Sequence, residues 1–183
     1  EAALLLQRIR NNEYLPVISS ACPAWVSFAE TEFPDLLPYL STCRSPQQMA
    51  STLAKVHIAE EETIKKPETI YTVAISPCTA RKYESRKPEL TRKGLPDTDL
   101  AISITELFQL IRLYGLDPLL AESEAMPQGL RSMTSAGKLS DISGGITEGV
   151  IRTFYSMATG KDLKEYRIEK LRNHKSRRDY TLK

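Results

Sequence analysis

The run TIYTVAI, residues 69–75, constrains the fold more than any other stretch of the sequence. It is unbroken and rich in β-branched residues, as is typical of a strand buried on both faces of a parallel sheet. Shorter apolar runs at 14–19 and 99–104 predict two more strands. Because helix-like segments alternate with these runs, the sequence predicts an α/β fold with a mostly parallel sheet flanked by helices.

The helix-like segments have recognisable ends. Ser45 and Pro46 form an N-cap followed by proline at the first helical position, and Gly160 fits a C-cap. Thr105 is expected near the N-cap of another helix, which stops at Gly115. The predicted helices cover residues 1–12, 23–33, 46–62, 79–87, 105–115 and 145–159, with an irregular stretch at 116–143 and late strands at 164–172 and from 179 onward.

Composition narrows the class of protein. A chain of 183 residues suffices for one domain, and its net charge of +2 is too small to favour nucleic acid or an anionic membrane as partner. No apolar run reaches the roughly 18 residues of a membrane span, and the start, EAALLLQRIR, is typical of a helix in a longer protein rather than of a signal peptide. Three widely spaced cysteines favour a reducing compartment, so we expect a cytoplasmic protein.

Two loops have a cysteine at the same place between predicted elements. SSACPAW and SPCTARKYE each place a cysteine after a predicted strand and before a predicted helix, so Cys22 and Cys78 are expected at one edge of one sheet. A thiolate near a helix N-terminus is stabilised there, and Arg81 and Lys82 would favour an anionic ligand. The alternative is that both cysteines are core residues and both cations are surface charges. Cys43 is expected to be structural.

Several motifs, in order along the chain, resemble the [FeFe]-hydrogenases. SSACPAW followed by SPQQ is similar to their TSCCPxW and SPQQ, and SPCTARKYE is similar to their MPCxxKxxE. DTDLAISITEL and SGGITEGVIR resemble two later segments of that family. The resemblance identifies residues 1–183 as part of an [FeFe]-hydrogenase catalytic domain, one lobe of a two-lobed domain that lacks its N-terminal part.

The resemblance implies an H-cluster, in which a [4Fe–4S] cubane is joined to a di-iron site with CO, cyanide and a dithiolate bridge. Cys22 and Cys78 would be two of four cubane ligands. Gln47, Glu84, Arg81 and Ser76 would line the cofactor site, with Arg81 and Ser76 replacing a lysine and a methionine. The third cysteine signature is absent from the sequence, so we expect the chain alone to hold no cofactor.

The proton relay implied by the resemblance is incomplete. Glu1 and Ser41 keep a glutamate and a serine of that relay, whereas Ala21 replaces its cysteine and Leu4 its second glutamate. Since proton transfer needs an acid or base within hydrogen-bond reach, neither replacement can pass a proton. These departures resemble the sensory branch of the family, whose members bind hydrogen without fast turnover.

The sequence therefore predicts a segment of a slow or hydrogen-sensing hydrogenase. Its partners would be H2 and protons, with a ferredoxin-like electron donor or a fused signalling domain in the longer protein. Two alternatives are a non-catalytic iron–sulfur protein with the same fold and an α/β interaction module without a cluster. A homo-oligomer of the chain is a further expectation, because a lobe without its partner would expose apolar surface.

Overall fold

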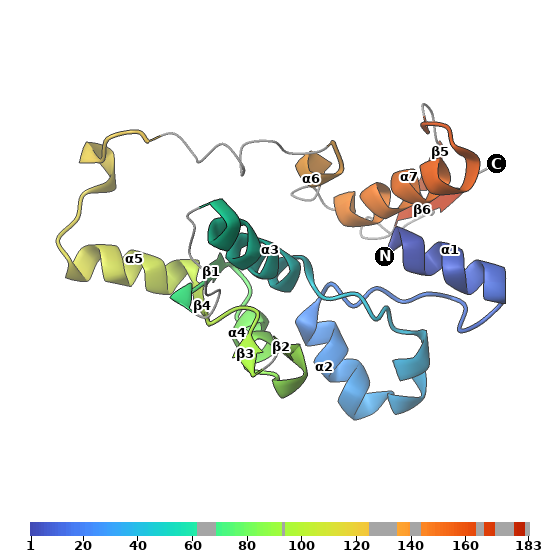
Figure 1. Ribbon diagram of the computed structural model, residues 1–183, viewed down its shortest axis with the longest axis horizontal. Helices are drawn as coiled ribbons and strands as arrows, with labels where there is room; N and C mark the ends of the chain where they lie inside the picture. Colours follow the sequence, from blue (N-terminus) through green and yellow to red (C-terminus); the bar gives the residue numbers. More distant parts are fainter. Residues whose placement is uncertain are drawn as a thin grey trace. The chain divides into compact units, whose positions relative to one another are not determined.

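A computed structural model describes residues 1–61, 69–92, 94–124, 135–139, 144–163, 167–170 and 178–181 (Figure 1). The chain forms two compact units, one of residues 16–126 and one that combines residues 1–15 with 127–183. In the described ranges, no helix combines the length and the apolar character needed to cross a membrane.

A pair of parallel strands lies at the centre of the larger unit. β1 (Val73–Ser76) pairs with β4 (Leu100–Ser103) in a register that runs from Val73 beside Leu100 to Ser76 beside Ser103. This pair, with the helices around it, confirms the predicted α/β class. The other elements of the unit are α2 (Pro23–Glu32), η1 (Pro34–Tyr39), α3 (Pro46–Glu61), α4 (Ala80–Ser85), η3 (Pro88–Leu90), β2 (Thr91–Arg92), β3 (Leu95–Pro96), α5 (Ile104–Leu113) and η4 (Pro118–Leu120).

The strand predicted at 14–19 is wrong. Only a single parallel bridge forms there, between Ile18 and Leu40, outside the β1–β4 sheet. The backbone explains the failure, because Tyr14 has a φ of 47° and Pro16 has no N–H to donate to a ladder. The loops of Cys22 and Cys78 therefore do not follow two strands of one sheet, which corrects the expectation from the sequence.

β1 is less buried than its apolar run predicts. Val73 is 48% exposed and Ile75 is 53% exposed, whereas Ala74 between them is half-buried. Among the described residues only β4 pairs with β1. One face of β1, and its second edge as far as the described residues go, therefore stay open, and the prediction of a strand buried on both faces is wrong.

β4 continues directly into α5, which begins one residue earlier than predicted. Ser103, not Thr105, is the N-cap: the Glu106 N–H donates to Ser103 Oγ at 3.2 Å, and the Ser103 N–H donates to Glu106 Oε2 at 2.8 Å. This reciprocal pair is a capping box. It fixes the turn at the carboxyl end of the sheet, where ligands bind in folds of this class.

The described part of the smaller unit is mostly helical. α7 (Gly145–Thr159) packs against α1 (Ala2–Asn11) and α6 (Ser135–Leu139), and β5 (Arg167–Lys170) pairs antiparallel with β6 (Arg178–Thr181). The predicted C-cap at Gly160 is confirmed by its φ of 69°. A Cβ at Gly145 would overlap the Leu139 carbonyl, so glycine permits this contact between α6 and α7. η4 and α6 correct the prediction that 116–143 is irregular throughout.

Candidate functional site

A hollow of about 590 Å³ runs between α3 and the open side of β1. One face of α3 forms one wall, residues 70–76 form the other, and Arg81 lies at the end where β1 stops. This α3–β1 hollow brings together three of the predicted site residues, Gln47, Ser76 and Arg81. An amide, a hydroxyl and a guanidinium thus converge on a space with partly apolar walls, the usual composition of a binding site.

Gln47 offers an unused hydrogen-bond donor to this hollow. It follows Pro46 in the first turn of α3, whose start is capped by the buried Ser45. Gln47 Nε2 is buried and has no hydrogen-bond partner among the described residues. A buried donor left unpaired costs roughly 1–3 kcal/mol, so native structures seldom keep one without a reason. The amide is therefore available to an acceptor inside the hollow.

The loop of Cys78 leaves β1 beside Ser76. The thiol of Cys78 is free and exposed, and its backbone N–H donates to Ser76 Oγ at 3.2 Å. The Arg81 N–H donates to the Cys78 carbonyl at 3.2 Å, which starts the turn into α4. Ser76 thus lines the hollow and also fixes the backbone of the cysteine, a serine turn that its S-x-C spacing could have signalled.

Glu84 lies behind Arg81 rather than in the α3–β1 hollow. Its Oε2 accepts from Arg81 Nη1 at 2.9 Å, and the residue is only 5% exposed. Glu84 lines a second, smaller hollow of about 220 Å³, together with Ser41 and Cys43. The structure therefore places Glu84 where it can orient Arg81.

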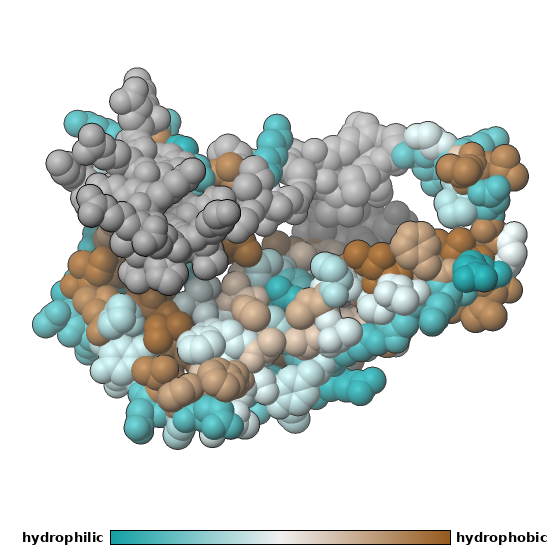
Figure 2. Space-filling model, turned by 180° about the vertical axis from the view of Figure 1, so that it is seen from behind, coloured by the Kyte–Doolittle hydropathy of each residue, from teal (hydrophilic) through white to brown (hydrophobic). Residues whose placement is uncertain are grey.

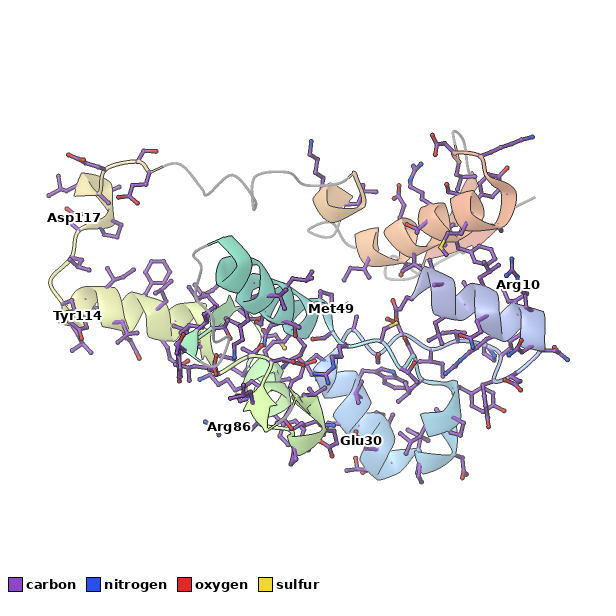
Figure 3. All side chains as sticks on the ribbon, viewed as in Figure 1. Arg10, Glu30, Met49, Arg86, Tyr114 and Asp117 are labelled. Carbon is purple, nitrogen blue, oxygen red and sulfur yellow. The ribbon has the colours of Figure 1, made fainter. Side chains whose placement is uncertain are left out.

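Cys22 occupies a comparable position on α2. It is the N-cap residue of that helix, its backbone is extended, and its thiol is free and exposed. α2 packs against α4, and Lys87 Nζ, just after α4, lies 2.6 Å from Glu30 Oε1 on α2. Figure 3 labels Glu30 on α2 and Arg86 just after α4. Both cysteines therefore precede helices that contact each other.

Ser41 and Glu1, the two kept members of the predicted relay, lie in different units. Ser41 is 6% exposed, its N–H donates to the Ile18 carbonyl at 2.7 Å, and its Oγ accepts from the Cys43 N–H at 3.1 Å. Glu1 is the N-cap residue of α1 in the smaller unit. Their part in proton transfer stays a prediction.

Sequence reasoning missed a second ion pair at the carboxyl end of the sheet. Lys82 on α4 contacts Glu106 on α5, and Glu106 also accepts from the backbone and hydroxyl of Ser103. The hydrogen bond from Lys82, and then those from Ser103, lower the pKa of Glu106 to about 2. This pair connects the helix after Cys78 to the helix after β4.

A family model described as the iron-only hydrogenase large subunit, C-terminal domain, matches residues 1–183. The NADP-reducing hydrogenase subunit HndD of Solidesulfovibrio fructosivorans is 38% identical over 161 residues, which are 88% of this chain and 27% of that protein. The cytosolic iron-sulfur assembly component 3 of Mus musculus is 35% identical over 175 residues, 91% of this chain and 36% of that protein. The chain thus spans about a third of these relatives.

Solved structures confirm the fold. An apo form of [FeFe]-hydrogenase HydA1 from Chlamydomonas reinhardtii matches with a TM-score of 0.75 at 28% identity, over 95% of this chain and 44% of that one. A second solved structure, which concerns oxygen inactivation of [FeFe]-hydrogenase at the 2Fe subcluster of its H cluster, matches with a TM-score of 0.76 at 28% identity, over 95% and 44% of the two chains. The predicted resemblance and fold class are both confirmed.

The residues of this chain fit such a cofactor only in part. The unpaired Gln47 amide and the Arg81 cation suit a group that carries acceptor ligands and negative charge. A [4Fe–4S] cluster needs four cysteine ligands, and the resemblance supplies two, Cys22 and Cys78. Among the described residues, no three His, Cys, Asp or Glu side chains gather where they could hold a metal. The assignment of Cys22 and Cys78 as cluster ligands therefore stays a prediction.

Proposed function

The chain belongs to the family of iron-only hydrogenase C-terminal domains, and we propose that it forms one side of an H-cluster site in a longer protein that binds hydrogen. In that protein, Cys22 and Cys78 would ligate the [4Fe–4S] part, and Gln47, Arg81 and Ser76 would face the di-iron part. Protons and H2 would be its substrates, and a ferredoxin-like donor or a fused signalling domain its redox or signalling partner.

One observation carries this proposal. The buried, unpaired Nε2 of Gln47 lies in the same hollow as the Arg81 guanidinium. Native structures seldom leave a buried donor without an acceptor, so the Gln47 amide suits a ligand in the hollow that accepts hydrogen bonds. Diatomic ligands with a partial negative charge, such as cyanide, would give both groups an acceptor.

We infer that turnover in the longer protein is slow. Ala21 is half-buried directly before Cys22 and has no group that can ionise. Leu4 on α1 likewise cannot carry a proton. Two relay positions without acid or base leave no continuous path for protons, which suits a sensor better than a fast catalyst.

A second candidate function is that of a non-catalytic iron–sulfur protein. The similarity to a cytosolic iron-sulfur assembly component over 91% of the chain favours it. In this case Cys22 and Cys78 would hold an iron–sulfur cluster, and the α3–β1 hollow would hold no di-iron group. The two candidates therefore differ in the use of Gln47 and Arg81.

Infrared spectroscopy distinguishes the two. The full-length protein that contains this chain would be matured anaerobically with the hydrogenase assembly machinery. Stretching bands of bound CO and cyanide are expected if the hollow takes the di-iron group. Bound iron without these bands would refute that function and favour the second candidate.

A further inference from the structure

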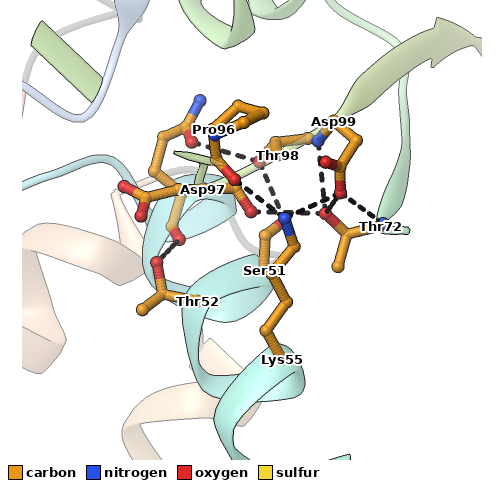
Figure 4. Close-up of polar contacts among 9 residues, drawn as sticks. Ser51, Thr52, Lys55, Thr72, Pro96, Asp97, Thr98 and Asp99 are labelled. Atoms are coloured by element: carbon orange, nitrogen blue, oxygen red, sulfur yellow. Dashed lines mark hydrogen bonds and ion pairs between the residues drawn. The ribbon is translucent and has the colours of Figure 1, made fainter. Parts of the chain in front are cut away.

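One carboxylate joins the two walls of the α3–β1 hollow. Asp99 Oδ2 accepts from the Thr72 N–H at 2.6 Å and from Thr72 Oγ1 at 2.8 Å, and Lys55 Nζ lies 2.8 Å away (Figure 4). Lys55 Nζ also donates to the Pro96 carbonyl at 2.8 Å. Thr72 directly precedes β1, Lys55 lies on α3, and Asp99 directly precedes β4. Three elements therefore meet at the Lys55–Asp99 pair.

This pair is shielded from water. The Lys55 and Asp99 side chains are only 12% and 14% exposed. Burial alone would raise the pKa of Asp99, but hydrogen bonds from Lys55 and Thr72 outweigh it and hold that pKa below its usual value. Both charges are thus paired and hydrogen-bonded, the condition under which a shielded ion pair fixes geometry.

The same side of α3 makes a second polar contact one turn earlier. Thr98 Oγ1 bonds with Gln48 Oε1 at 3.1 Å and with Ser51 Oγ at 2.8 Å, and both Gln48 and Thr98 are fully buried. Gln48, Ser51 and Lys55 lie at i, i+3 and i+7, so they form one stripe of the helix. Anchoring this stripe to residues 96–99 sets the rotation of α3 about its own axis.

That rotation decides where Gln47 points. Gln47 is adjacent to Gln48, and successive side chains of an α-helix differ by about 100° in direction. We propose that Lys55 and Asp99 are positioning residues, which hold α3 and β1 so that the Gln47 amide faces the hollow. Neither side chain lines the hollow itself. The inference rests on the proposed function, because that function supplies a ligand that accepts a hydrogen bond from the Gln47 amide.

The test uses the chain labelled with 15N-glutamine, so that each glutamine gives its own side-chain amide signals. In Lys55→Met, the signals of Gln47 and Gln48 are expected to shift beyond their linewidths, while those of Gln7 and Gln109 stay in place. A double variant, Lys55→Met with Asp99→Asn, removes both charges and keeps an acceptor for Thr72. It is expected to show the same shifts without leaving a carboxylate unpaired.

Lys87→Met is the matched control, because it removes another ion pair, between Lys87 after α4 and Glu30 on α2, that involves no residue of α3. Gln47 signals that stay unchanged in the folded double variant would overturn the inference. A shift of equal size in Lys87→Met would overturn it too. The NMR measurement needs no cofactor. It is therefore independent of the infrared experiment, in which missing CO and cyanide bands in the full-length protein would refute the proposed function.

Discussion

Arg81 Nη1 donates a hydrogen bond to Glu84 Oε2 at 2.9 Å, and the two residues line different hollows of the larger unit. Arg81 faces the α3–β1 hollow, whereas Glu84 lies behind it with its side chain 7% exposed. Arginine replaces the lysine of the family signature here. It keeps the positive charge but presents a planar fork, which a single carboxylate can orient. Glu84 therefore sets how Arg81 faces the hollow.

Replacing Glu84 tests this pair. Glu84→Gln should lower the free energy of unfolding by roughly 1–3 kcal/mol, because it leaves a mostly buried guanidinium without its charged partner. Urea denaturation measures the change. Glu89→Gln, an exposed glutamate beside the same smaller hollow, should change stability by less than about 0.5 kcal/mol. Equal effects of the two substitutions would contradict the orienting role of Glu84.

The Lys82–Glu106 pair predicts a pH dependence. Glu106 has a folded-state pKa of about 2 against an ordinary value of 4.5, so its contribution to stability is complete above pH 4.5 and is lost as the pH falls toward 2. Urea midpoints of the unmodified chain and of Glu106→Gln should therefore converge over this range. A difference that stays constant from pH 5 to pH 2 would show that Glu106 titrates normally.

Restoring the relay cysteine alone should not restore fast turnover. In the matured full-length protein, Ala21→Cys returns one proton carrier, but Leu4 still interrupts the path. The rate of hydrogen production is expected to rise far less in Ala21→Cys than in the double variant Ala21→Cys with Leu4→Glu. Full recovery of the rate in Ala21→Cys would contradict the interpretation that both Ala21 and Leu4 interrupt the proton relay.

An apolar surface at the end of α5 predicts self-association. Figure 2 shows hydrophobic side chains gathered over α5 and the segment after it, and Figure 3 labels Tyr114 there. Leu119 is 93% exposed and Leu120 is 81% exposed. Apolar patches of this kind favour association. Sedimentation should show larger species that Leu120→Glu reduces and Gln109→Glu does not. A monomer at all concentrations would contradict the prediction.

Local signals predicted the helices well. Proline after Cys22 and after Ser45 marks two true helix starts, and glycine at 160 marks a true end, because these residues act on their own backbone. The strand at 14–19 failed since its apolar pattern could not reveal the positive φ of Tyr14. The predicted burial of β1 is wrong because burial depends on neighbours that a local run does not specify.

The site was predictable only through motifs. Gln47, Ser76 and Arg81 came from the resemblance, and the structure brings them to one hollow. The Lys55–Asp99 network had no such signal. Its hydrogen bonds join residues 27 and 41 positions apart, so no local periodicity could pair them. The inward-facing polar stripe of α3 at Gln48, Ser51 and Lys55 was the one available hint.

The central claim is that Cys22 and Cys78 are metal ligands whereas Cys43 is structural. Its most direct test is the iron content of three variants of the matured full-length protein, Cys22→Ser, Cys78→Ser and Cys43→Ser, together with their CO and cyanide infrared bands. Cys22→Ser and Cys78→Ser should lose cluster iron and the bands, and Cys43→Ser should keep both. Full iron content and unchanged bands in Cys22→Ser or Cys78→Ser would contradict the claim.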